Sequence, residues 1–128
     1  MNRQIIITAA VLGMLGVIAG AFAAHGLKPK LTPQNIEIWH TAVQYQFYHV
    51  FALLFLATFS RFSNSLINIS FYCFTFGIIF FSGSLYLLAC GDLLGWGWLS
   101  IMGPITPLGG VLFIAGWVCL ALAAFRNK

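Results

Sequence analysis

The charged residues of this chain stand far apart, and the stretches between them constrain its fold more than any other feature. The chain has six basic and two acidic side chains. They are Arg3, Lys28, Lys30, Glu37, Arg61, Asp92, Arg126 and Lys128. Long uncharged runs separate them, at residues 4–27, 38–60, 62–91 and 93–125. Since a charge at the middle of a bilayer costs roughly 2.5–3.5 kcal/mol, this spacing is typical of segments that cross lipid.

Each uncharged run is long enough to cross a membrane as a helix. A hydrocarbon core about 30 Å thick needs roughly 20 residues at about 1.5 Å each. Only 6% of the residues are charged and 61% are hydrophobic, whereas soluble domains carry about 25% charged residues. The sequence therefore predicts a single-domain, all-α membrane protein. It should place four transmembrane helices in an antiparallel bundle, with spans at about 4–25, 34–60, 66–90 and 101–125.

The first span resembles a secretory signal peptide, because Arg3 precedes an apolar run that ends in Ala-Phe-Ala at residues 21–23. Small residues nevertheless recur along one of its helical faces, at Ala9, Gly13, Gly16, Gly20 and Ala24. In lipid, such a face lets two helix backbones approach closely. We therefore expect a retained span that packs on a neighbouring helix, and we expect Gly83 to serve as a further packing residue in the third span.

The basic residues predict the orientation. With four spans, Arg3, Arg61, Arg126 and Lys128 share one side of the membrane, and Lys28 and Lys30 share the other. Cytoplasmic loops carry the excess of Lys and Arg. The sequence thus predicts a multi-pass protein of the cell membrane with both termini in the cytoplasm. Trp39, Trp96 and Trp98 should then gather at the outer interface.

The second span carries the sharpest candidate, His49. Small and polar residues, among them Tyr45 and His49, share one helical face, while bulky Phe47 and Phe51 lie opposite. Bulky apolar residues suit lipid, so His49 should point into the bundle and form a hydrogen bond to another helix. We expect this partner in the first span near His25, or at the backbone near Pro104 and Pro107. His49 then either locks the packing or takes part in transport, proton or ligand chemistry.

Most other polar residues of interest lie toward the outer end. The candidate cluster consists of His25, Tyr45, His49, Asp92 and Thr106. A haem between His25 and His49 is conceivable in a four-helix bundle, but no further residue supports it. His40 and His49 are nine residues apart and project to opposite sides of one helix, which argues against a zinc site. We expect no cofactor and no metal. The scattered basic residues argue against nucleic-acid binding.

Four segments of the chain resemble a known family. They are GAFAAHGL at residues 20–27, TAVQYQFYH at 41–49, FSGSLY at 81–86 and the Gly- and Pro-rich segment 103–110. Together they resemble the small bacterial membrane proteins of the domain of unknown function 423 family, related to the eukaryotic transmembrane protein 256. The resemblance covers essentially the full chain, although the family usually has glycine where this chain has Ala23. It implies a four-span membrane protein and assigns no activity and no role to His25 or His49.

The sequence favours a membrane protein without catalysis of its own, acting in interaction, assembly or envelope maintenance. Its partners would be the lipid bilayer and either a second copy or another membrane protein. The alternative is a small oligomeric transporter or channel, because helix breakers at 103–110 and an inward His49 could line a cavity. A membrane enzyme or haem protein is the least favoured class.

Overall fold

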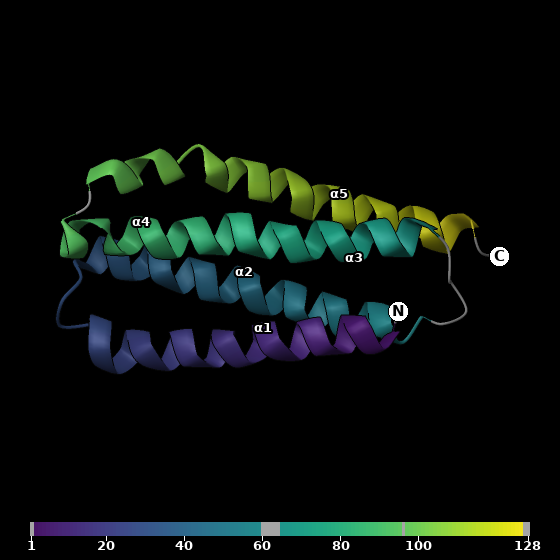
Figure 1. The fold of residues 1–128 in the computed structure, drawn as a ribbon, viewed down its shortest axis with the longest axis horizontal. Coiled ribbons are helices and arrows are strands. Elements are labelled where there is room, and N and C mark those ends of the chain that lie inside the picture. Colours follow the sequence, from purple (N-terminus) through teal and green to yellow (C-terminus); the bar gives the residue numbers. More distant parts are fainter. Residues whose placement is uncertain (1, 60–64, 96, 127–128) are drawn as a thin grey trace.

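The computed structural model describes residues 2–59, 65–95 and 97–126, apart from the side chains of residues 2 and 98–100. Its helical segments are α1 (Asn2–Phe22), η1 (Ala23–Leu27), α2 (Pro33–Ala57), α3 (Ser65–Gly77), η3 (Ile78–Ser82), α4 (Gly83–Leu94), η4 (Gly97–Met102) and α5 (Ile105–Arg126). η1 continues α1, and α3, η3 and α4 form one long rod, so the described residues make four long rods and no strand (Figure 1). The predicted all-α class is confirmed.

Three of the four rods are long and apolar enough to cross a membrane. They are Arg3–Leu27, Ser65–Leu94 and Ile105–Arg126. α2 is not among them, since polar side chains such as Gln46 and His49 interrupt its apolar residues. Its 25 residues nevertheless make a helix about 37 Å long, at about 1.5 Å per residue. It runs beside the other rods (Figure 1). α2 is therefore the helix whose polar groups need cover from its neighbours.

The rods form an antiparallel bundle. α1 packs against α2, α2 packs against α4 and η3, and α5 packs against α3 and η3. α1 and α5 make no extensive contact within the described part of the chain, so they form the two edges of the layer (Figure 1). The N- and C-termini lie at the same end. We call this end the terminal end and the opposite one, with the α1–α2 and α4–α5 connections, the distal end.

The bounds of the rods differ from the expected spans for local reasons. α2 ends at Ala57 instead of residue 60, with Thr58 as its C-cap, and the Thr58 hydroxyl donates to the carbonyl of Phe55 at 2.7 Å. At the distal end, α4 ends at Leu94 and is capped by Gly95, whose φ of 68° suits glycine. The expected irregularity at 103–110 is a break before Ile105, with the 3₁₀ segment η4 ahead of it. The π-helical turns η1 and η3 were not predicted; such turns insert one extra residue into an α-helix.

Two apolar cores lie along the bundle. The core toward the terminal end includes Leu53, Leu56, Phe74 and Phe113. The core toward the distal end surrounds Trp39, which is only 8% exposed and donates from Nε1 to the Ala19 carbonyl at 2.9 Å. The indole thus joins α1 to α2 near the distal end, and its position at the outer membrane interface stays a prediction. Trp96 and the side chain of Trp98 lie outside the described residues.

Glycines set the closest helix crossings. The small-residue face of α1 lies on α2, where a Cβ on Gly16 would come within 2.9 Å of the Phe47 ring. Gly13 and Gly20 face Val50 and Val43 at ordinary contact distances. Gly83, in contrast, has nothing within 4 Å of the position that a Cβ would occupy, so it is not a packing residue.

The tightest seam joins α5 to α3 and η3, and its glycines were not singled out from the sequence. A Cβ on Gly77 would lie 2.5 Å from the Phe113 ring, and one on Gly116 would lie 2.6 Å from the Phe74 ring. A Cβ on Gly109 would overlap the backbone of Phe81. Rings on each rod thus fill the gaps left by glycines on the other, which is how small residues bring helices together in lipid.

Candidate functional site

α2 turns its polar side chains toward two different neighbours. Gln46 and His49 are both 4% exposed. Gln46 meets α1 and α4, whereas His49 meets α5. Residues three apart share one face of a helix but are offset by less than a full turn, so Gln46 and His49 both point into the bundle and meet different neighbouring rods.

The His49 imidazole is fixed by two hydrogen bonds. Nδ1 lies 2.7 Å from the Tyr45 carbonyl oxygen, and the Trp117 indole Nε1–H donates to Nε2 at 3.1 Å. An indole N–H can only donate, so Nε2 accepts and the proton of the neutral ring resides on Nδ1, which donates to Tyr45. Both ring nitrogens are therefore occupied by protein partners, and the Trp117 bond joins α2 to α5.

Aromatic rings surround this histidine. Its ring stacks on Phe113 with centroids 3.6 Å apart and an interplanar angle of 6°. Tyr45 lies nearly parallel to both, at 20° to His49 and 24° to Phe113. Tyr45 also contacts the Phe81 ring at 4.7 Å. The result is a set of ring faces of similar orientation at the meeting point of α2, η3 and α5.

A groove of about 490 Å³ opens beside these rings. We call it the α2–α5 groove; its lining consists of Tyr45, Tyr48, His49, Phe81, Gly110, Phe113, Ile114 and Trp117. Tyr48 and Ile114 are 53% and 65% exposed, so the groove faces outward between the two helices. In a bilayer this side would meet hydrocarbon.

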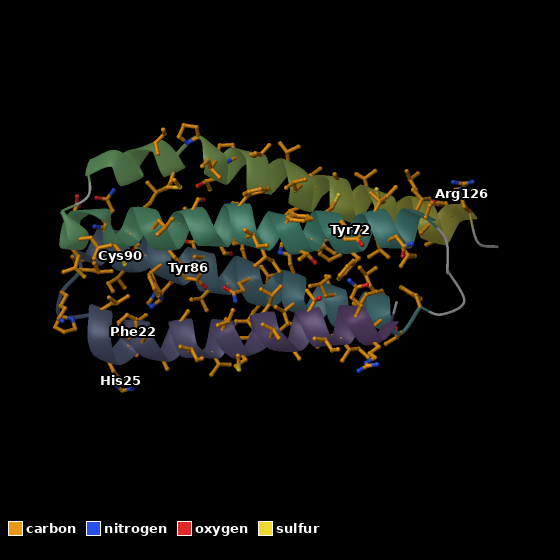
Figure 2. The ribbon with its side chains drawn as sticks, in the orientation of Figure 1. Phe22, His25, Tyr72, Tyr86, Cys90 and Arg126 are labelled. Atoms are coloured by element: carbon orange, nitrogen blue, oxygen red, sulfur yellow. The ribbon has the colours of Figure 1, made fainter. Side chains whose placement is uncertain are left out.

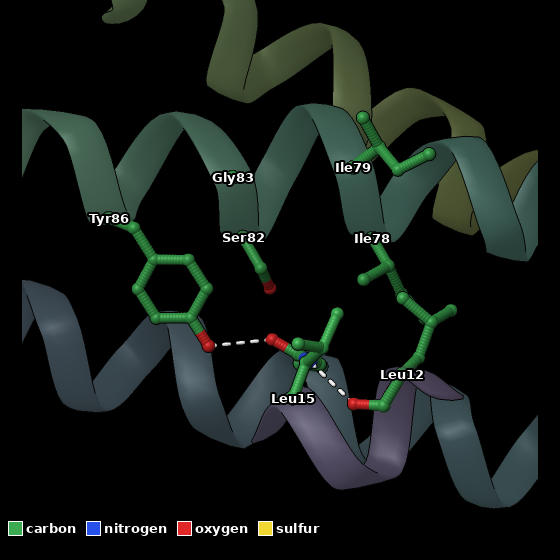
Figure 3. Close-up of a pocket in the computed structure, with 8 residues that line it drawn as sticks. Leu12, Leu15, Ile78, Ile79, Ser82, Gly83 and Tyr86 are labelled. Atoms are coloured by element: carbon green, nitrogen blue, oxygen red, sulfur yellow. Dashed lines mark hydrogen bonds between the residues drawn. The ribbon is translucent and has the colours of Figure 1, made fainter. Parts of the chain in front are cut away.

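A second groove, of about 360 Å³, lies between α1 and the η3–α4 segment (Figure 3). At its base, Gln46 Nε2 donates to the Leu12 carbonyl at 2.6 Å, and the Tyr86 hydroxyl donates to Gln46 Oε1 at 2.6 Å (Figure 3). Ser82, also in the lining, donates to the Ala42 carbonyl at 2.7 Å. These polar groups bind one another and hold three rods together.

The predicted polar cluster is dispersed. His25 is exposed on η1 and points away from the other rods (Figure 2). Asp92 accepts a hydrogen bond from Asn35 Nδ2 at 3.3 Å at the distal end, and Thr106 pairs with Ser84 at 2.6 Å. Of the five residues, Tyr45 and His49 are joined by a hydrogen bond, because they are four apart on one helix.

The predicted hydrogen-bond partners of His49 are wrong. The structure does show the inward orientation of His49 and a hydrogen bond between it and another helix. The partner is Trp117, in the middle of α5, rather than the first span or the backbone near Pro104 and Pro107. His25 and His49 lie on different rods and do not face each other, so no haem would fit between them. Among the described residues, no group of three His, Cys, Asp or Glu side chains is placed to hold a metal ion.

Gln46 and Trp117 are the important residues that the sequence reading missed. Gln46 has the helical spacing of a core position, three or four residues from Ala42, His49 and Val50, all buried. A polar residue with that spacing must find a partner in the bundle, which is a signal that the sequence contains. Trp117 offers no such signal, since its neighbours on α5 are apolar.

Comparisons with known proteins identify relatives that are named membrane proteins. The family model described as "Protein of unknown function (DUF423)" matches residues 19–110. The UPF0382 membrane protein YwdK of Bacillus subtilis is 41% identical over 127 residues, which cover 97% of this chain and 98% of that protein. A UPF0382 membrane protein of Staphylococcus haemolyticus is 40% identical over 124 residues, 97% of each chain. One of Staphylococcus epidermidis is 43% identical with the same coverage. No solved structure matches this chain.

Proposed function

This chain belongs to the DUF423 family of membrane proteins, and on that premise we propose that it binds apolar partners inside the bilayer and has no catalysis of its own. Binding of apolar partners is a more specific version of the interaction or envelope-maintenance role that the sequence favours. The α2–α5 groove is the observation that carries it. The groove is lined almost entirely by rings and aliphatic groups, as ligand sites usually are, and with the bundle in a bilayer it would open toward hydrocarbon.

The state of the buried polar groups supports this choice. Within the described part of the chain, every buried side-chain nitrogen or oxygen already has a hydrogen-bond partner. The Gln46 and His49 networks are used for joining helices. A pathway for ions or solutes needs polar groups that face water along its length. A binding role needs only an apolar surface with a few anchoring groups.

We also propose how the four rods are placed in the cell membrane. α2 would be the fourth span, because the other rods cover its polar face and leave Phe51 and Phe55 outward, 61% and 52% exposed. The terminal end would face the cytoplasm. Arg126 lies there (Figure 2), as does the first turn of α1, which contains Arg3, whereas the α1–α2 connection with Lys28 and Lys30 is at the distal end (Figure 1). Arg61 and Lys128 fall outside the described residues.

One observation favours the alternative of an oligomeric transporter. The break before Ile105 lies beside the Ser84–Thr106 hydrogen bond, at the distal half of the bundle. Broken helices with polar side chains line the substrate sites of many transporters. In this chain the two hydroxyls bond to each other, and Thr106 also donates to the Met102 carbonyl at 3.4 Å. A flux measurement in liposomes separates this alternative from the binding role.

Site-specific photocrosslinking in cells tests the binding role directly. A photoreactive amino acid at Ile114, inside the groove, should give one discrete adduct identifiable by mass spectrometry. The matched control is Ile18, an equally apolar position on the outward face of α1 that is 57% exposed. Combining the Ile114 probe with Gly110→Leu, which fills the groove, should remove the adduct. Identical adducts at Ile114 and Ile18, or solute flux through the purified protein, would contradict the proposal.

A further inference from the structure

Of the four rods, α2 is the one whose composition does not suit a membrane span. Gln46 and His49 lie in its middle third and are each only 4% exposed. Since hydrocarbon offers no hydrogen bonds, a polar side chain at this depth needs a partner within the protein. The positions of these partners along the chain therefore decide when α2 is stable in a bilayer.

α1 precedes α2 in the chain and accepts two hydrogen bonds from it. Gln46 Nε2 donates to the Leu12 carbonyl at 2.6 Å, and Trp39 Nε1 donates to the Ala19 carbonyl at 2.9 Å. Once α1 and α2 have both been synthesised, these two donors of α2 already have their acceptors.

The side-chain acceptors of α2 depend instead on rods that follow it in the chain. The Tyr86 hydroxyl on α4 donates to Gln46 Oε1 at 2.6 Å, and the Trp117 indole on α5 donates to His49 Nε2 at 3.1 Å. No other donor among the described residues pairs with either acceptor. An acceptor without a donor is costly in hydrocarbon. A hairpin of α1 and α2 alone would therefore leave two polar atoms of α2 without partners.

Whether α2 crosses the membrane decides where the C-terminus lies. The three apolar rods, Arg3–Leu27, Ser65–Leu94 and Ile105–Arg126, would by themselves place the two termini on opposite sides. With α2 inserted there are four crossings, and both termini share one side, as they share one end of the bundle (Figure 1). Insertion of α2 thus separates two topologies of the same chain.

We propose that α2 is a conditional span, which stays in the bilayer only while α4 and α5 cover its two acceptors. This inference rests on the four-span placement proposed above and is independent of what the α2–α5 groove binds. A chain that loses this cover keeps three spans and has its C-terminus outside. The α5 seam contributes to the cover, because the close approach of Gly109 to the Phe81 backbone fixes the height of Trp117 beside His49.

Thiol labelling of intact cells tests this dependence in the full-length protein. A cysteine added at the C-terminus should be protected from a membrane-impermeant reagent. In the double variant Tyr86→Phe, Trp117→Phe, the ratio of outside to inside C-termini should rise about sevenfold, the effect of losing two interhelical hydrogen bonds of average strength. Tyr72→Phe, at an exposed position on α3, is the control and should leave the ratio unchanged.

A second pair of substitutions tests whether the polar atoms of α2 are the cause. Gln46→Leu with His49→Leu removes both acceptors, so α2 no longer needs cover. Added to the double variant, this pair should restore the protected C-terminus, and also the amount of protein in the membrane if the double variant is degraded. A double variant as abundant and as protected as wild type, or no restoration by the leucines, would overturn the inference. Labelling of the wild-type C-terminus from outside would instead refute the four-span placement, and neither result concerns the Ile114 adduct.

Discussion

At the residue scale, His49 and Trp117 show how a polar side chain is accommodated inside an apolar bundle. The imidazole donates to its own helix and accepts from α5, so neither ring nitrogen faces lipid. Hydrogen bonds between membrane helices contribute only modestly, about 0.6 kcal/mol on average, because the unfolded protein in the membrane also finds partners. This pair is therefore expected to set the rotation of α5 against α2 more than to supply most of the stability.

A double-mutant cycle tests the bond between these two residues. We expect His49→Leu and Trp117→Phe each to lower the free energy of unfolding by about 1–2 kcal/mol, since each leaves one polar atom unpaired and disturbs the ring stack. The double variant should lose less than the sum, with a coupling of about 0.5–1 kcal/mol. Unfolding in mixed micelles gives these values. His40→Leu, an exposed histidine on the same helix, is the control, and additive effects would show that the bond contributes nothing.

At the element scale, the α5 seam is determined by the absence of side chains at a few positions. Gly77, Gly109 and Gly116 are where rings or backbone of the facing rod approach most closely. The ring contacts can adjust, because a side chain can rotate. The contact at Gly109 cannot adjust in this way, because the facing atoms belong to the backbone of Phe81.

Adjacent glycines provide a matched test of this seam. Gly109→Ala should lower the free energy of unfolding by about 1–3 kcal/mol, because the added methyl overlaps the Phe81 backbone and forces the helices apart. Gly110→Ala should not lower the free energy of unfolding. Its methyl would meet only the Phe81 ring, at 4.0 Å, and alanine favours the helix. Denaturation of both variants in detergent is the measurement. Equal loss at the two positions would mean that the seam is looser than the structure indicates.

At the scale of the whole molecule, the bundle is a layer with two open edges. α1 and α5 each cover one side of the central rods and leave apolar faces outward, including Val17 and Ile18 on α1 and Val111 and Val118 on α5. Apolar faces of this extent would be untenable in water but are ordinary in lipid. The layer also brings both termini to one end and places the α1–α2 connection at the other (Figure 1).

The orientation of this layer gives the prediction at this scale. A cysteine added at either terminus should resist a membrane-impermeant thiol reagent in intact cells and react after lysis, because Arg3 and Arg126 favour the cytoplasmic side. Pro29→Cys, in the exposed connection at the distal end, should react from outside. The unaltered protein, with its three native cysteines, gives the background. Labelling of a terminal cysteine from outside would contradict the proposed topology.

The sequence alone determined the properties that belong to single helices. Charge spacing predicted the helical class and the long rods, and the small-residue spacing located the face of α1 that lies on α2. Helical periodicity predicted that His49 points inward, since its neighbours on the opposite face are bulky and apolar. Each of these conclusions depends on the residues of one uncharged run and the charges that bound it, so no knowledge of the fold was needed.

The tertiary structure alone decided how the helices meet. It assigned Trp117 to His49, joined Gln46 to Tyr86, placed Phe81 against Gly109, and separated His25 from the inner polar residues. Such pairings depend on the register and rotation between rods. In lipid, an apolar face gains little by exchanging hydrocarbon for another helix. Close packing and hydrogen bonding therefore select the partners, and these depend on atoms from different rods in one geometry.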